Sequence, residues 1–117
     1  MKNALYFAWS YPAQKFGGAV HTLATCFAPG WQRMLYALME RTALQPDHFP
    51  ERDLYDRYSN LLKQAREFGP LYIGQRPYWG SLENTLRRRR RVTLSRYARE
   101  IVAISEAIES RRGSYID

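Results

Sequence analysis

The chain has 117 residues, of which 45% are hydrophobic and 25% are charged. This length predicts one domain over residues 1–117, with the composition of a globular protein rather than a disordered one. The single cysteine, Cys26, excludes an internal disulfide framework, and no apolar run approaches the ~20 residues that span a bilayer. The start of the chain lacks the pattern of a signal peptide. We therefore expect a cytoplasmic protein with no membrane partner.

The first part of the chain predicts a short strand followed by a loop and a helix. Residues 4–9 are apolar and aromatic, and the run is too short to favour a helix, so we expect a strand. A loop should follow over residues 10–18 and end at Gly17-Gly18. The next helix should then continue to Pro29-Gly30.

Two further helices are expected in the middle of the chain, over residues 31–44 and 50–68. In the second of these, Pro50 suits the first helical turn. Apolar residues then repeat every three or four positions, which is typical of a helix with one buried face. They are Leu54, Tyr58, Leu61, Ala65 and Phe68.

The last part of the chain predicts a loop and a long helical region. Residues 70–80 are rich in Gly and Pro and predict a loop, in which 71–73 is the candidate partner of the N-terminal strand. Ser81 is a candidate cap for the following helix, and the C-terminal helix should end near Gly113. Its apolar stripe comprises Leu94, Tyr97, Ile101, Ile104 and Ile108. Together the elements predict a mostly α, single-domain bundle of four to five helices.

The arginine segment, residues 87–99, accounts for the excess charge of the chain. Seven of its thirteen residues are arginines and none is acidic. Removing these seven from the 18 basic residues leaves 11, equal to the 11 acidic residues, so the net charge of +7 is local. A local positive field attracts phosphates or an acidic protein surface. The arginines are Arg87, Arg88, Arg89, Arg90, Arg91, Arg96 and Arg99.

The arginine segment also leaves the helical structure of residues 81–112 open. Five consecutive arginines cover every side of a helix, and like charges four residues apart destabilise it. Either the helix breaks near Val92-Thr93, with Thr93 or Ser95 capping a new one, or it continues and Arg90 lies along its surface. A helix-turn-helix is not expected after Ser95, because Val102 occupies the position of the usual turn glycine.

We interpret the segment first as a binding site for nucleic acid, RNA or DNA, or for a nucleoprotein complex. Arginines neutralise phosphates, and Tyr78 and Trp79 just upstream are candidates for stacking on bases. Alternatively, Tyr78 and Trp79 cap the core, and the arginines form a solvated helix face paired with carboxylates elsewhere. A third interpretation is an adaptor or inhibitor, of the kind that phages and mobile elements direct against host defence complexes, docking on an acidic protein surface. Self-association is also considered, because aromatic residues are enriched in interfaces.

No pattern of residues predicts catalysis, a cofactor or a metal site. His21 and Cys26 lie five residues apart on an expected helix, about 140° from each other, so they do not form a catalytic pair. His48 precedes a predicted helix and suits a capping or surface role. No metal-ligand spacing or phosphate-binding glycine loop is present. We therefore expect a small non-enzymatic protein that binds through the arginine segment.

Overall fold

The computed structural model describes residues 4–26, 30–39 and 44–114, and most of these residues are helical. This confirms the mostly α fold that the sequence predicts. Six α-helices, one short 3₁₀ helix and a two-stranded hairpin make up the described elements. Their order is α1 (Ala4–Ala8), α2 (Ser10–Thr25), α3 (Gly30–Met39), η1 (Pro46–His48), α4 (Arg52–Ala65), β1 (Leu71–Ile73), β2 (Arg76–Trp79), α5 (Ser81–Leu86) and α6 (Arg91–Gly113).

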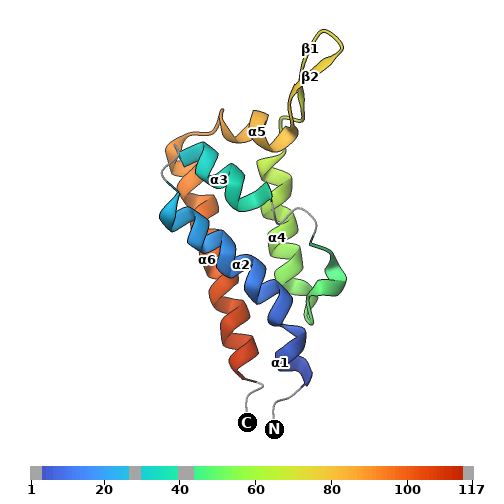
Figure 1. Ribbon diagram of the computed structural model, residues 1–117, viewed down its shortest axis with the longest axis vertical. Coiled ribbons are helices and arrows are strands. Elements are labelled where there is room, and N and C mark those ends of the chain that lie inside the picture. The colour runs from blue at the N-terminus through green and yellow to red at the C-terminus, as the bar shows by residue number, and fades with distance from the viewer. Residues whose placement is uncertain (1–3, 27–29, 40–43, 115–117) are drawn as a thin grey trace.

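The core forms where α6 packs against α2, α3 and α4 (Figure 1). The predicted stripe of α6 provides Tyr97, Ile101, Ile104 and Ile108, all of which are buried. Opposite them, α2 contributes Phe16 and α4 contributes an apolar face that includes Tyr58, as the sequence predicts. Burying these faces is the main force that holds the helices together.

The N-terminal strand and loop predicted over residues 4–18 are wrong. Residues 4–8 form α1, and α2 begins at Ser10 and continues through Gly17 and Gly18. Pro12 is tolerated because it lies in the first turn, where backbone N–H groups have no helical partner. The helix persists at its glycines because Ala13, Phe16 and Ala19 are buried against the core, and packing outweighs propensity.

Helices α3 and α4 lie where they are predicted, but the described helices are shorter. Helix α3 covers residues 30–39, residues 40–43 lie outside the described part, and Leu44 is not helical. Pro50 precedes α4 rather than occupying its first turn, since Glu51 is the N-cap residue. At its other end α4 stops at Ala65, and Phe68 therefore leaves the apolar stripe and is exposed.

Residues 71–79 form a β-hairpin, not the predicted loop, and β1 pairs with β2 rather than with the N-terminus. Gly74 has a φ of +64° and occupies the first position of the two-residue turn. This is the position that requires glycine in a type II′ hairpin. The hairpin projects from one end of the molecule, and both chain termini lie at the opposite end (Figure 1).

The region 81–112 is broken into α5 and α6 by residues 87–90, here called the arginine loop. Of the two predicted arrangements, the break is the one observed, but it lies before Val92. Arg90 is the N-cap residue with extended backbone (φ −70°, ψ 155°), so neither Thr93 nor Ser95 caps the helix, and Ser81 follows the N-cap residue Gly80. From Arg91 onward α6 is continuous, which excludes a helix-turn-helix within it.

The molecule is elongated, with extents of 58 × 27 × 18 Å. Its long axis runs from the termini to the tip of the hairpin (Figure 1). Within the described residues, no helix combines the length and apolar character needed to cross a lipid bilayer.

Candidate nucleic-acid interface

The arginines of the segment divide by exposure into a half-buried set and an exposed set. Arg87 and Arg89 are half-buried, whereas Arg88, Arg90, Arg91, Arg96 and Arg99 are exposed. The division follows from the break between α5 and α6, because the arginine loop turns successive side chains in different directions. The sequence pattern alone treats all seven arginines as equivalent, and the fold separates them.

Arg87 connects the hairpin to α5. Its guanidinium carbon lies 3.6 Å from the centroid of the Trp79 ring, and its Nη2 donates to Asn84 Oδ1 at 3.2 Å. The amide of Asn84, which is itself buried, donates to the carbonyl of Gly69 at 3.0 Å. Arg87 and Asn84 thus hold the two ends of the hairpin, near Gly69 and Trp79, against α5.

A second buried polar residue, Thr85, supports the same end of the hairpin. Its hydroxyl accepts a hydrogen bond from the backbone N–H of Phe68 at 3.0 Å, and its side chain is fully buried. Phe68 in turn lies under Arg88 and Arg89, whose guanidinium carbons are 4.4 and 4.7 Å from the ring centroid. The Phe68 ring therefore packs against two arginines of the arginine loop.

Arg89 also binds the C-terminal end of α4. Its Nη2 donates to the carbonyl of Gln64 at 2.9 Å and to the carboxylate of Glu67 at 3.2 Å. Arg88 makes no ion pair with any described residue and reaches solvent beyond Phe68. Arg89 is consequently an anchor between the arginine loop and α4, and Arg88 is available to a partner.

Arg90, Arg91 and Arg99 have no side-chain hydrogen bond or ion pair within the described residues. Arg91 and Arg99 lie eight residues apart on α6, which is about 12 Å along the helix axis and 80° around it. The helix fixes the spacing of their backbone positions, and the two side chains are exposed to solvent. Nothing in the described part of the fold neutralises them.

Arg96 and Arg99 border a groove of about 510 Å³ between α4 and α6. Arg96 donates to the side-chain oxygen of Gln64 at 3.3 Å. Arg57 and Glu100 also line the groove, and they bind each other through contacts of 2.6 and 3.3 Å, which raise the pKa of the Arg57 guanidinium. The lining of the groove therefore combines one ion pair with two further arginines.

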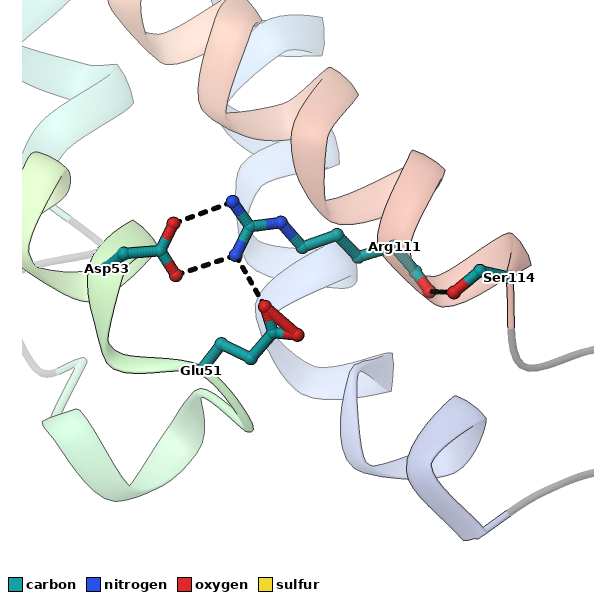
Figure 2. A network of polar contacts seen from close by, with 4 residues as sticks. All are labelled: Glu51, Asp53, Arg111 and Ser114. Atoms are coloured by element: carbon teal, nitrogen blue, oxygen red, sulfur yellow. Dashed lines mark hydrogen bonds and ion pairs between the residues drawn. The ribbon is translucent and has the colours of Figure 1, made fainter.

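At the end of the molecule near the chain termini, by contrast, arginines are paired with carboxylates. Arg111 binds both carboxylate oxygens of Asp53 at 2.6 Å and Glu51 at 2.8 Å (Figure 2). The hydrogen bonds from Arg111 hold the pKa of Asp53 below its usual value of 3.8, and the pKa of Arg111 is raised. Arg52 pairs with Asp56. The arginines at this end are thus paired with carboxylates, whereas Arg88, Arg90 and Arg91 meet no carboxylate among the described residues.

The hairpin places aromatic side chains beside the arginine loop. Tyr78 is 56% exposed, and its ring centroid lies 4.8 Å from that of Trp79. Trp79 is half-buried, with Arg87 over its ring, but neither Trp79 nor Tyr78 is among the residues that form the core or pack against it, so the interpretation that they cap the core is not supported. Arg76, a further exposed residue of the hairpin, was not predicted from the sequence to belong to the site. The Gly-Gln pair between two β-favouring runs was the signal that could have identified the hairpin and hence the place of Arg76.

His21, Cys26 and His48 are the residues that were considered as candidates for catalysis. His48 accepts a hydrogen bond from the backbone N–H of Gln45 at 2.9 Å and so closes the turn of η1, which confirms its capping role. His21 is exposed on α2, and Cys26 is half-buried just beyond the end of that helix. Among the described residues, no cluster of His, Cys, Asp and Glu has the composition of a metal site.

Comparisons with known proteins identify no relative. No family model, no curated sequence and no solved structure matches the chain. The function of the protein is therefore inferred from the chemistry and placement of the residues described above.

Proposed function

We propose that this protein binds nucleic acid through phosphate contacts made by Arg88, Arg90, Arg91, Arg96 and Arg99, and that it does so without catalysing a reaction. The observation that carries the proposal is the set of exposed arginines that meet no carboxylate in the described fold. Arginines near the chain termini are paired with Asp or Glu, so a solvated, self-neutralised surface does not account for the arginine loop and the start of α6.

The physical basis is counterion release. Each arginine that neutralises a phosphate releases condensed cations, which supplies affinity that is independent of base sequence. The planar guanidinium also matches the geometry of a phosphate better than an ammonium group does. Because Arg91, Arg96 and Arg99 lie on a formed helix, their backbone need not be ordered on binding, and the entropy cost is limited to the side chains.

The test compares two double variants that each remove two positive charges. Arg90→Ala/Arg91→Ala removes unpaired charges at the start of α6, whereas Lys15→Ala/Arg52→Ala removes charges nearer the other end of the molecule. Fluorescence anisotropy with a labelled 20-nucleotide strand should show at least tenfold weaker binding for the first variant and a change of less than threefold for the second. Equal losses in the two variants would show that only net charge matters and would overturn the proposed site.

A second candidate function is docking on an acidic protein surface, as an adaptor or inhibitor. It is favoured by Ile73 at the hairpin and Val92 on α6, which are 62% and 67% exposed apolar side chains. Purification from the native host, split into nuclease-treated and untreated samples, separates the two functions. A partner protein that is retained at fixed stoichiometry after nuclease treatment supports docking on a protein surface. Loss of the partner protein together with the nucleic acid supports nucleic-acid binding.

A further inference from the structure

Strand β2 carries two consecutive aromatic residues whose rings lie side by side. In a regular strand, consecutive side chains point to opposite faces. Here Leu71 is opposite Trp79 and Tyr72 is opposite Pro77, so Tyr78 is an extra residue between two pairs. A bulge of this kind changes the direction of a side chain. It explains why the rings of Tyr78 and Trp79 approach to 4.8 Å, inclined by 41°.

The ring of Tyr78 is the accessible member of a supported stack. Arg87 lies over the Trp79 ring at 3.6 Å, and Arg87 is itself fixed by its hydrogen bond to Asn84. The contacts of Asn84 and Thr85 fix the other end of the hairpin to α5. The Tyr78 ring is therefore held beside Trp79, which Arg87 fixes to the folded body, although the hairpin projects from that body (Figure 1).

We propose that Tyr78 stacks on an unpaired base of a single-stranded nucleic acid whose phosphates contact Arg88, Arg90 and Arg91. This inference rests on the proposed function and adds the strand state of the ligand. Bases in a duplex are stacked on each other, whereas a single strand offers free base faces to an aromatic ring. Charge complementarity favours the same occupant, because Arg76 is exposed on β2 and no residue from 71 to 79 is acidic.

The hairpin supplies its own matched control for this inference. Tyr72 is 55% exposed, close to the value for Tyr78, but has no ring or hydrogen-bond contact within the described residues. It therefore shares the residue type, the hairpin and the exposure of Tyr78 but not the support of Trp79 and Arg87. A general effect of removing an exposed aromatic residue should appear equally at both positions.

The experiment measures binding of a labelled 20-nucleotide single strand and of the corresponding duplex to three variants. Tyr78→Ala should bind the single strand about tenfold more weakly, with an unchanged salt dependence and duplex affinity within twofold of the original chain. Tyr78→Phe should retain the single-strand affinity, since the ring remains, and Tyr72→Ala should lose less than threefold. Circular dichroism confirms that each variant is folded.

The outcomes separate this inference from the proposed function. The stacking inference is overturned by any of three results for Tyr78→Ala: the same single-strand affinity as the original chain, an equal loss of affinity for the single strand and the duplex, or a loss of single-strand affinity no larger than that of Tyr72→Ala. If Arg90→Ala/Arg91→Ala still weakens binding in that case, the proposed function stands alone. If the original chain binds neither ligand at low salt, both proposals are overturned, and a protein partner becomes the alternative to pursue.

Discussion

Arg87 and Arg90 belong to the same run of arginines, and the structure predicts opposite consequences for their removal. Arg87→Ala removes a stacked guanidinium from Trp79 and leaves the buried side-chain oxygen of Asn84 without its donor. The lost cation–π contact is worth about 1 kcal/mol. The unsatisfied oxygen adds roughly 1–2 kcal/mol. We therefore expect the free energy of unfolding to fall by about 2–3 kcal/mol, whereas Arg90→Ala should lower it by less than about 0.5 kcal/mol.

Thermal unfolding monitored by circular dichroism measures this difference directly. For a chain of this length, a loss of 2–3 kcal/mol corresponds to a decrease in Tm of about 10 °C. Arg87→Lys is the informative intermediate, because lysine keeps the charge but lacks the planar group that stacks on Trp79. A Tm for Arg87→Ala within about 2 °C of the original value, or an equal decrease for Arg90→Ala, would refute the division of the arginines into two sets.

Three further changes test other parts of the fold. Asp53→Asn should make the free energy of unfolding less sensitive to acid. Because Arg111 lowers the pKa of Asp53 in the folded protein, the ionised carboxylate stabilises the fold above about pH 4. This contribution, about 1 kcal/mol for an exposed ion pair, is lost as the pH falls through the folded pKa. Urea titrations of the variant and the original chain at pH 3 and pH 7 measure this difference. An equal loss of unfolding free energy between pH 7 and pH 3 in both proteins would contradict the role of Asp53. Ile104→Ala should cost about 2–5 kcal/mol in a urea titration at neutral pH, because the side chain is fully buried in α6; a cost below 1 kcal/mol would argue against the α6 core. Gly74→Val should destabilise the hairpin by about 1–2 kcal/mol at its positive φ, seen as faster amide exchange in residues 71–79, and unchanged exchange would contradict the type II′ turn.

The periodic parts of the sequence predicted the structure well, for a physical reason. In α4 and α6, apolar residues every three or four positions bury one face, and tertiary packing stabilises the helix that this pattern favours. Tyr58 and Ile101 are buried as the pattern indicates. The end of α4 was less predictable, since Phe68 continues the spacing but lies beyond the last helical turn, where Arg88 and Arg89 cover its ring.

The errors lie where local signals compete. Residues 4–9 form an apolar run too short to distinguish a strand from a helix, and Gly17-Gly18 indicates a break that packing of α2 overrides. The hairpin was missed because glycine and proline indicate a loop as readily as a turn between strands. Only the pairing of β1 with β2 shows which of the two is present.

The candidate site could be located from the sequence, but its members could not be separated. Seven arginines without an acidic residue identify the region. Which of them face solvent depends on the break at residues 87–90 and on partners outside the segment, such as Gln64 for Arg89 and Trp79 for Arg87. Gln64 lies 25 residues from Arg89 along the chain, and the hairpin that positions Trp79 was itself not predicted, so the local sequence does not distinguish Arg89 and Arg87 from Arg90.

The measurement that tests the central claim most directly is the salt dependence of single-strand binding by the original chain and by Arg90→Ala/Arg91→Ala. Five phosphate contacts with a single strand predict that the logarithm of affinity falls with the logarithm of salt concentration at a slope of about −3.5, and the variant, which loses two contacts, should reduce the magnitude of this slope by about 1.4. Absence of binding at low salt, or the same slope in both proteins, would contradict the claim that the unpaired arginines at the start of α6 bind phosphate.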